Sequence, residues 1–542
     1  MDASYPYTTT HSNLEQLPQS QNSLIFISDY PFHDGINSNL SLKQIHNNIP
    51  HLNQISPFSI DITSKTVHDP IHGAMTFPKY MWEFIDTPQF QRLRFLKQLS
   101  ITYFVYPGGN HTRFEHCLGT GYLANDLVKR CFRSLNCENK YIIDCVSLAG
   151  LCHDIGHGPF SHTFDSILHS LGIGKEWNHE DFSKDILKYL IDDNYLDVDN
   201  DKLNFIHSLI VGDKQIQTDY QWIYQIVANK TNSIDVDKFD YICRDIYHLG
   251  LHNLSVDYSR VYNDCKIIDD TICYSEKNDY TLLSIFESRL SLHKKVYKHN
   301  KGTCINTMIK DALCLSNSYF NFNEAIKSPK LFLQLDDNII QIIRNFSLDP
   351  DEEIRNDPSL LKAEQIINDL YSRNLYRFIG DILIPTNIQY EPDVNEFLCY
   401  DNPKDELYVS KEDVELVKLA YDFGNKFNNP FNNIYFYNPK QPNKCFKKLQ
   451  RHSLLTPNVF REYCVKVICK DKNKVERVTN MFNKYKMKLY KQWGVSLNKN
   501  QNNTCSENES HEDNNNNNKS VNSRVFDFLG NKRKMNVLTP HK

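Results

Sequence analysis

Three histidines and two aspartates crowd into the stretch LCHDIGHGPFSHTFD, residues 151–165. His153 and Asp154 are adjacent, so they offer a neutral nitrogen ligand and an anionic oxygen ligand at one point. That mixture suits a divalent transition metal such as iron, manganese or zinc. His157 follows His153 at a spacing of four, which on a helix would place both imidazoles on the same face. We expect this stretch to bind a divalent metal.

Two glycines and Pro159 interrupt the helical pattern of this stretch. On an unbroken helix, His162 would stand about 13 Å along the axis from His153. We therefore predict two helices that meet at a turn and aim their imidazoles at one point, with Ser161 as the N-cap of the second helix. Isolated histidines are usually surface or satisfied core residues, but burying five ionisable groups without partners is costly.

Two further segments offer partners for this stretch. One is HTRFEHCLG (111–119), and the other is SIDVDKFDYICRDIYHLGL (233–251). Taken as a helix, the second segment separates an apolar stripe from a polar face. A solvated face would explain the charges alone, whereas the mixture of acids, a phenol and cations could bind a metal, a sugar hydroxyl and phosphates. The polar face contains Asp237, Tyr241, Asp245 and His248, flanked by Lys238 and Arg244.

The bulk composition is that of a soluble globular protein. The chain has 542 residues, 40% hydrophobic and 23% charged, and its length suggests about two to four domains. It contains no apolar run of about 18 residues and no basic-then-apolar leader, so we expect neither a membrane span nor a secretory signal. Fifteen cysteines without CxxC pairs indicate reduced thiols and hence the nucleus or cytoplasm. With a net charge of −5, anionic ligands must be held by local cations.

The predicted fold is mainly α, with a helical core, a smaller α+β C-terminal lobe and disordered tails. Helical apolar spacing recurs through the middle of the chain. Strand-like pieces (NIYFYN, EYCVKVICK) and a helix over VERVTNMFNKYKMKLYKQW follow later. The basic end GNKRKMNVLTPHK is either a nuclear import signal or a solvated tail. The predicted divisions are an arm (1–58), the helical domain (59–395), an α+β regulatory or oligomerisation lobe (396–495) and an Asn-rich tail (496–542).

The order of these motifs resembles that of the HD-domain phosphohydrolases. The closer resemblance is to the dNTP triphosphohydrolases that combine a sterile alpha motif with an HD domain, and it spans roughly residues 65–493. The arm is too polar to pack a sterile alpha motif. The resemblance is carried by DPIHG, IDTPQFQRLRFLKQL, HTRFEHCLG, GLCHDIGHGPFSHTFD, DVDKFDY and SLHKKVYKH.

The resemblance implies hydrolysis of a dNTP at the α-phosphate, which yields a deoxynucleoside and triphosphate. It implies a helical HD core and metal ligation by His116, His153, Asp154 and Asp237. His157, His162, Asp165 and His179 would support catalysis around the metal or form a second metal site. His162 is the candidate general acid and His179 the alternative, because an imidazole titrates near neutral pH.

The resemblance also implies a substrate site. Arg113, Lys238 and Arg289 would bind phosphates, while Gln98 and Asp245 would hold the sugar 3′-hydroxyl. Tyr241 would stack under the sugar and exclude a 2′-hydroxyl by steric conflict. His293 and Tyr297 complete the expected substrate set.

The resemblance also implies an activator site for GTP or dGTP at Lys65, Asp86, Gln91 and Arg94. Mg²⁺ would accompany the nucleotide. The expected assembly is a homo-oligomer, dimer to tetramer. The alternative is an ordinary amphipathic helix over QFQRLRFLKQL. This chain departs from the family pattern at His68, at Ser100–Thr102 and at Asn300, where the family has a phosphate-binding lysine. These changes spare the catalytic set and affect a second nucleotide site.

Two alternative functions have sequence support. One is a different HD nucleotide phosphohydrolase, acting on a monoester or diester. The other is a scaffold that binds single-stranded nucleic acid and keeps a vestigial site. The basic face that would serve the scaffold contains Lys484, Lys486, Lys488 and Lys491.

Overall fold

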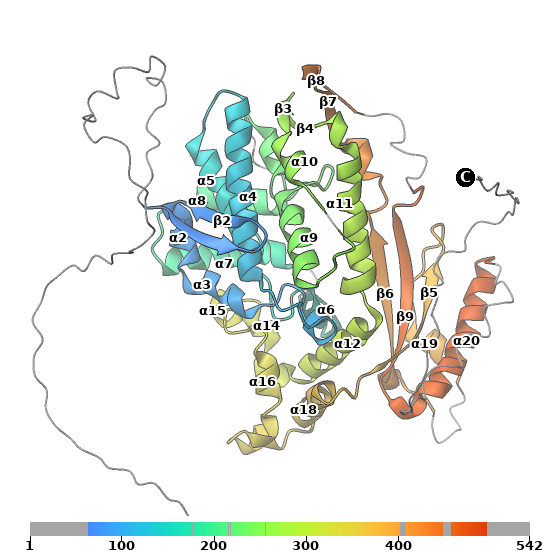
Figure 1. Ribbon diagram of the computed structural model, residues 1–542. Coiled ribbons are helices and arrows are strands. Elements are labelled where there is room, and N and C mark those ends of the chain that lie inside the picture. Colours follow the sequence, from blue (N-terminus) through green and yellow to red (C-terminus); the bar gives the residue numbers. More distant parts are fainter. Residues whose placement is uncertain are drawn as a thin grey trace, which may run out of the picture. The chain divides into compact units, whose positions relative to one another are not determined.

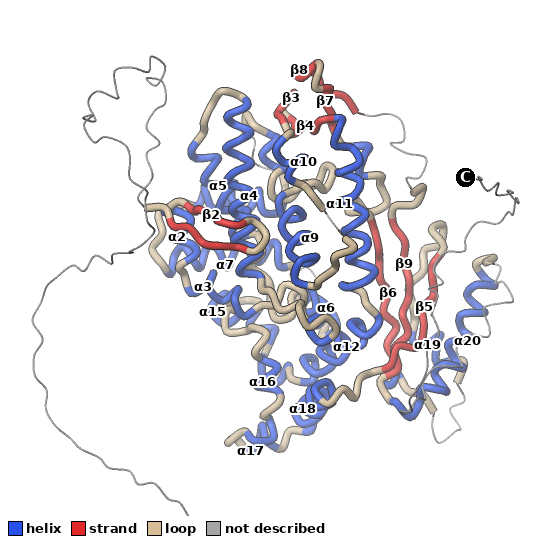
Figure 2. The backbone as a smooth tube through the Cα atoms, in the orientation of Figure 1, coloured by secondary structure: helices blue, strands red, loops and turns tan. Residues whose placement is uncertain are grey.

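A computed structural model describes residues 63–174, 177–214, 216, 218–254, 256–401, 408–447 and 457–495. The predicted arm (1–58) and tail (496–542) lie outside the described residues. Helices dominate the rest (Figures 1 and 2). Those of the central body are α2 (Lys79–Ile85), α3 (Pro88–Gln91), α4 (Arg113–Ser134), α5 (Lys140–Cys152), α6 (His162–Ser170), α7 (His179–Asp193), α8 (Asn200–Val211), α9 (Val236–His248), α10 (Ser259–Asn263), α11 (Asp279–Leu292) and α12 (Asn300–Leu315).

Short helices follow α12 and lead to the C-terminal part. They are α13 (Asn317–Phe320), α14 (Phe322–Ala325), α15 (Pro329–Phe332), α16 (Ile339–Ile343), α17 (Glu352–Arg355), the longer α18 (Pro358–Tyr371), α19 (Val394–Leu398) and finally the long α20 (Val475–Gln492). The late helix predicted over VERVTNMFNKYKMKLYKQW is thus confirmed. The mainly α fold with a smaller strand-containing part is also confirmed.

Helices α4 and α5 pack closely and bring two predicted ligands together. At Gly150 of α5, an added Cβ would lie 2.6 Å from Ala124 Cβ and 3.1 Å from the Thr120 carbonyl oxygen of α4. The absence of a side chain therefore lets the two backbones approach. His116 lies one turn into α4, and His153 directly follows α5, so this packing sets their separation.

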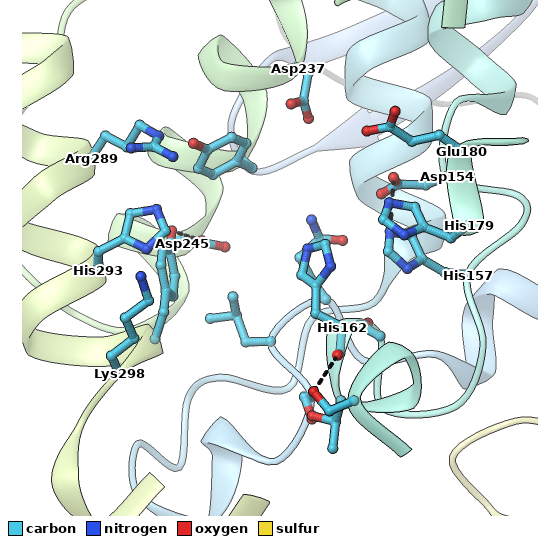
Figure 3. Close-up of a pocket in the computed structure, with 18 of the residues that line it drawn as sticks. Asp154, His157, His162, His179, Glu180, Asp237, Asp245, Arg289, His293 and Lys298 are labelled. Carbon is cyan, nitrogen blue, oxygen red and sulfur yellow. Dashed lines mark hydrogen bonds and ion pairs between the residues drawn. The ribbon is translucent and has the colours of Figure 1, made fainter. Parts of the chain in front are cut away.

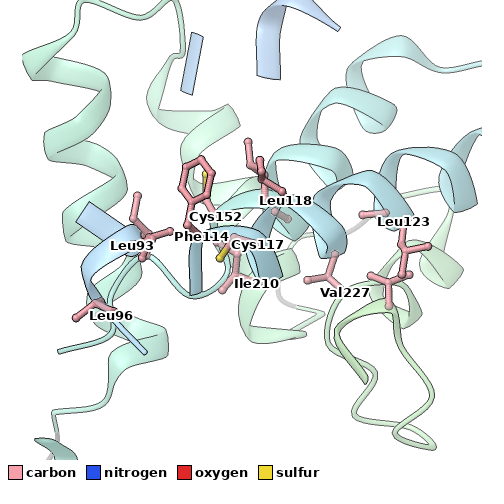
Figure 4. Packing of buried hydrophobic residues seen from close by; sticks show 14 of the residues in the cluster. Leu93, Leu96, Phe114, Cys117, Leu118, Leu123, Cys152, Ile210 and Val227 are labelled. Atoms are coloured by element: carbon pink, nitrogen blue, oxygen red, sulfur yellow. The ribbon is translucent and has the colours of Figure 1, made fainter. Parts of the chain in front are cut away.

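The core of the helical body joins segments that are distant in sequence (Figure 4). Leu96 precedes α4, Phe114 begins it, Cys152 ends α5 and Ile210 lies near the end of α8; all four side chains are at least nine-tenths buried. Removing such surface from water is the main favourable contribution to folding. The same burial fixes the helix ends that carry the polar residues described below.

In the part of the chain that the structure describes, the strands form three sheets. The hairpin consists of β1 (Lys65–Asp69) and β2 (Gly73–Phe77). A four-stranded sheet has the order β3-β4-β7-β8, and a three-stranded antiparallel sheet has the order β5-β9-β6. Their bounds are β3 (Lys266–Ile268), β4 (Thr271–Ser275), β5 (Arg377–Ile384), β6 (Val414–Asp422), β7 (Tyr435–Asn438), β8 (Gln441–Lys447) and β9 (Arg461–Cys469).

Strand pairing crosses the division predicted between residues 395 and 396. β5 precedes that division yet pairs along its length with β9. β7 follows it yet pairs in parallel with β4 of the helical body. The α+β part therefore includes β5, and two strands of the predicted lobe belong with the helical body, because backbone hydrogen bonding between distant segments leaves no trace in local composition.

Helix α20 packs its apolar face on the three-stranded sheet, with Met481 and Tyr485 buried in that core. Two lysines of the predicted basic face have intramolecular partners. Lys486 Nζ donates to the Asp381 carbonyl oxygen at 3.0 Å, and Lys488 Nζ pairs with a Glu396 carboxylate oxygen at 3.1 Å. Among the described residues, no helix combines the length and apolar character needed to cross a bilayer.

We predict that Gly150→Ala destabilises the protein by about 1–3 kcal/mol, because its methyl group would force α4 and α5 apart. The matched control is Gly302→Ala in α12, where the nearest atom to an added Cβ is 3.7 Å away. This substitution should stabilise the protein by about 0.5–1 kcal/mol through helix propensity. Urea unfolding followed by circular dichroism measures both, and equal shifts would contradict the role given to α4–α5 packing.

Candidate active site

Four predicted ligands converge from three helices. His116 comes from α4, His153 and Asp154 from the end of α5, and Asp237 from the first turn of α9. The Nε2 atoms of the two histidines are 3.1 Å apart. Asp237 Oδ1 lies 3.2 Å from His116 Nε2 and 3.5 Å from His153 Nε2. The Asp154 oxygens lie 3.6 Å and 3.4 Å from the same two nitrogens. We call these four side chains the HD centre.

The HD centre fits a divalent ion. Neighbouring ligands of one ion with bonds of about 2.0–2.2 Å stand about 3.0–3.6 Å apart, which matches the separations above. His153 Nδ1 donates to the Gly150 carbonyl oxygen at 2.9 Å, and His116 Nδ1 donates to Asp240 Oδ2 at 2.7 Å. Both Nε2 lone pairs therefore face each other, an arrangement that a shared cation stabilises.

The charges around the HD centre also favour a cation at this point. Burial opposes charge on His116, but hydrogen bonds to Asp237 and Asp240 outweigh it and raise the pKa of His116 to about 10. Burial likewise opposes the charge on Asp237, while its two histidine partners hold the pKa of this carboxyl below its usual range. The surrounding carboxylates therefore stabilise positive charge at the point where the four side chains meet.

Local capping places the carboxylates. Asp235 is the N-cap of α9 and accepts from the backbone N–H of Lys238 at 3.1 Å, so Asp237 lies in the first turn. Helix α5 ends at Cys152, and His153 is its C-cap. The expectation that His153 and His157 share a helix face is therefore wrong: the chain turns between them, and each imidazole has its own surroundings.

A second group of histidines lies beside the HD centre. His157 stacks on His179 with ring centres 3.8 Å apart, and His162 is 5.1 Å and 5.2 Å from these two rings. Asp165 Oδ2 lies 3.5 Å from His162 Nδ1 and 3.4 Å from His179 Nδ1. The predicted break before α6 is confirmed, but it directs His162 to this group and not to the HD centre.

Ser161 precedes α6 as predicted but does not cap it. Its hydroxyl donates to the Lys97 carbonyl oxygen at 3.1 Å and accepts from Arg113 Nε at 3.0 Å. Phe160 and Ser161 both adopt a φ of 56°, a left-handed conformation that costs free energy in residues with side chains. Tertiary contacts thus replaced the local cap that the sequence suggested.

His153, Asp154 and Asp237 of the HD centre and the three histidines of the second group line a cavity of about 1180 Å³. Asp154, His157 and His179 stand on one side in Figure 3, with Arg289, His293 and Lys298 opposite. His162 extends into the space between, and its side chain is 75% exposed. All predicted substrate residues line this cavity: Gln98, Arg113, Lys238, Tyr241, Asp245, Arg289, His293 and Tyr297.

Three of the cations that line the cavity have acidic partners. Burial lowers the pKa of His293 to about 2, with nearby Arg289 and Lys298 adding to the effect, so this imidazole is neutral. Asp245 accepts from Tyr297 and lies 2.7 Å from His111 Nε2. The ion pairs are Arg113 with Asp154, Lys238 with Asp235 at 3.0 Å, and Arg289 with Asp422 at 3.0 Å.

Comparison with known proteins decides the family. The HD domain family matches residues 113–233. The chain is 38% identical over 431 residues to the Dictyostelium discoideum protein named deoxynucleoside triphosphate triphosphohydrolase SAMHD1 homolog, covering 78% of this chain and 80% of that protein. It is 34% identical to the Xenopus laevis and Homo sapiens proteins named deoxynucleoside triphosphate triphosphohydrolase SAMHD1, over 77% of this chain and 73% and 71% of those proteins. The chain belongs to the SAMHD1 family.

The residues predicted to bind an activator form two pairs in this SAMHD1-family chain. Lys65 Nζ lies 2.9 Å from Asp86 Oδ2, and Gln91 Oε1 accepts from Arg94 Nε at 2.7 Å. The Arg94 guanidinium stacks 3.5 Å from the Phe114 ring centre. The segment is not one amphipathic helix, because α3 gives way at residue 92 to a 3₁₀ turn. Nucleotide binding at these residues stays a prediction.

One departure from the SAMHD1-family pattern has a structural counterpart. Asn300 Oδ1 accepts from Lys466 Nζ of β9 at 2.7 Å, so a cation from another element reaches this position. His68 is exposed on β1. Sequence reasoning missed Lys298, although it lies within the quoted SLHKKVYKH, because no helical face singled it out.

Asp240 was also missed. It lies one turn after Asp237 on α9, within the quoted DVDKFDY, and the spacing of three could have identified it as a residue on the same side. Its carboxylate is completely buried and contacts His116 from behind the HD centre.

We predict that His153→Ala loses at least tenfold in metal affinity, whereas His162→Ala keeps its metal. The reason is geometric: the His153 nitrogen faces the other ligands, while His162 belongs to the second group. Metal content after anaerobic purification, measured by elemental analysis, tests both variants. Equal metal loss in the two variants would contradict the separation into two groups.

Proposed function

We propose that this chain hydrolyses deoxynucleoside triphosphates at the α-phosphate and releases a deoxynucleoside and triphosphate. The observation that carries the proposal is that the HD centre and a cationic wall line one cavity. Membership of the SAMHD1 family supports the substrate class. The catalytic demands of such a step are positioning and neutralisation of phosphate charge.

The HD centre would hold a divalent ion of iron, manganese or zinc through His116, His153, Asp154 and Asp237. When bound, such an ion lowers the pKa of a coordinated water towards about 7 and offsets phosphate charge. Asp154 stays ionised: burial and the charge of Arg113 act on it in opposite directions, and its cationic neighbours hold its pKa well below the usual range. We further propose that Mg²⁺ accompanies the triphosphate.

The second histidine group would deliver the proton that the leaving 5′-oxygen needs. His162 is the better donor, because its side chain is 75% exposed to the cavity while that of His179 is 15% exposed. Asp165 orients both rings. Burial raises the pKa of Asp165, but hydrogen bonds from His162 and His179 more than compensate, so the carboxylate stays ionised and remains an acceptor for both rings.

The opposite wall would bind the triphosphate and the sugar. Arg289 and Lys298 offer positive charge to the phosphates, and a phosphate that replaces Asp422 as the partner of Arg289 could accept two parallel hydrogen bonds from the guanidinium. Asp245, already oriented by Tyr297, would accept the sugar 3′-hydroxyl together with Gln98. Tyr241 would exclude a 2′-hydroxyl and so select deoxyribose.

Regulation completes the proposal. We propose that GTP or dGTP binds at Lys65, Asp86, Gln91 and Arg94, displaces the Lys65–Asp86 pair and promotes assembly of dimers into tetramers. Both partners of that pair are more than half exposed, so a nucleotide has access to them.

We predict that dGTP, with Mn²⁺ and GTP present, yields deoxyguanosine and triphosphate in equal amounts, as identified by ³¹P NMR and chromatography. His162→Ala should lower kcat by about 10²–10⁴-fold through loss of the proton donor. The control is His169→Ala on the same helix, an exposed histidine outside the cavity lining, with unchanged kcat. Release of orthophosphate would indicate another HD phosphohydrolase, and no turnover of any dNTP would contradict the proposed function.

We predict that kcat/KM for dGTP falls above about pH 8. Burial lowers the pKa of Lys298 from its usual value to about 8, with Asp422 partly opposing the effect. The pocket therefore loses one positive charge as the pH rises through this value, and phosphate binding weakens. Lys298→Arg keeps its charge and should remove this limb of the pH profile, whereas an identical alkaline limb in the variant would exclude Lys298 as its source.

A further inference from the structure

A buried network of charges lies behind the HD centre, and none of its residues lines the cavity. Asp240 is its hub. Oδ2 of Asp240 accepts from His116 Nδ1 at 2.7 Å and from Arg244 Nε at 2.9 Å. Its Oδ1 pairs with Arg244 at 2.7 Å and with His72 Nε2 at 2.7 Å. Asp240 and Arg244 are completely buried, so neither charge has water to replace these partners.

The β1–β2 hairpin contributes two residues to this network. Asp69 is the last residue of β1, and His72 lies in the turn between the strands. Asp69 Oδ2 pairs with Arg244 at 2.7 Å, and Asp69 Oδ1 accepts the backbone N–H groups of Ile71 and His72 at 2.9 Å and 3.0 Å. The Tyr258 hydroxyl lies 3.1 Å from His72 Nδ1. A donated hydrogen bond at Nδ1 leaves the His72 proton on Nε2, directed at Asp240. The hairpin is thus bonded to Asp240 through His72 and to Arg244 through Asp69.

The fold makes room for this hub at Gly119 of α4. A Cβ at this position would lie 1.9 Å from Asp240 Oδ1 and 2.7 Å from an Arg244 nitrogen. No side chain fits there without displacing the carboxylate. Helix α4 therefore supplies both His116 and, three residues on, the space that lets Asp240 reach it.

The outer partner of a metal-binding histidine decides which ring nitrogen carries the proton and how the ring is oriented, and its loss commonly costs 10–100-fold in metal affinity. Asp240 is this outer partner for His116, because it accepts the hydrogen bond from His116 Nδ1. Among the described residues, the Asp240 carboxylate otherwise pairs only with Arg244, which is bonded to Asp69 of the hairpin, and with His72, which belongs to the hairpin turn. A hairpin outside the HD domain match at 113–233 thus supports the ligand geometry.

We propose that the β1–β2 hairpin is a positioning element of the metal centre, acting through His72 and Asp69 on the Asp240–Arg244 pair that orients His116. The inference rests on the proposed function only in assigning a metal to the HD centre. His72, Asp69 and Asp240 are positioning residues, because none of them touches the cavity.

The test is the affinity of the full chain for Mn²⁺, measured by electron paramagnetic resonance of the free ion. His72→Ala should weaken Mn²⁺ binding about tenfold, and Asp240→Asn about 10–100-fold. His72→Gln, whose amide can still donate to Asp240, should recover most of the wild-type affinity. The control is Thr76→Ala on the same hairpin, which removes only an exposed hydrogen bond to Thr66 and should bind within twofold of wild type.

The outcomes are separable. Thermal unfolding without metal shows whether each variant is folded, and Asp69→Asn replaces any variant that is not. Wild-type affinity in His72→Ala and Asp240→Asn would overturn the inference, as would equal weakening in Thr76→Ala. Metal affinities that follow the predicted order in a chain that hydrolyses no dNTP would support the positioning role and reject the proposed function.

Discussion

Carboxylates buried close together are the constraint on which this structure depends. Asp154 and Asp240 are buried, and Asp237, which is 29% exposed, contacts the same His116, so removal from water and mutual repulsion oppose the charge on these carboxylates. Each therefore needs a cation. Arg113 serves Asp154 and Arg244 serves Asp240, which leaves the point between the histidines and Asp237 as the place where positive charge is still required. A metal ion and the buried arginines would both offset the charge of these carboxylates.

The ends of three helices bring these carboxylates and histidines together. The start of α4, the end of α5 and the first turn of α9 come together, and each contributes a polar residue from a segment whose other side is apolar core. Close backbone packing at Gly150 and the missing side chain at Gly119 remove the bulk that would keep these ends apart. Rigid helices then hold the ligands at separations that a flexible loop would not maintain.

The cavity shows why the C-terminal sheet belongs to the catalytic unit. Residues of β6 line the cavity together with the histidines, and Asp422 at the end of β6 is the partner of Arg289. Strand β1 of the hairpin links the predicted activator group to the buried charges behind the HD centre. It begins at Lys65, a member of the activator group, and ends at Asp69, which pairs with Arg244. Segments outside the HD match thus surround the centre on several sides.

The sequence by itself determined the chemistry available: the ligand types, their order along the chain, the break before α6 and the mainly helical fold all follow from residue identity and local periodicity. The family resemblance already implied that His116 and His153 form one group and that His157, His162 and His179 form another, and the tertiary structure supplied the contacts that define the two groups. It also decided the role of Asp240, the pairing of β5 with β9 and the ion pairs that occupy the cations. The physical reason is that these features arise from contacts between residues far apart in the sequence, such as His72 and Asp240 at 168 positions, and from the cost of burying charge, neither of which local spacing records.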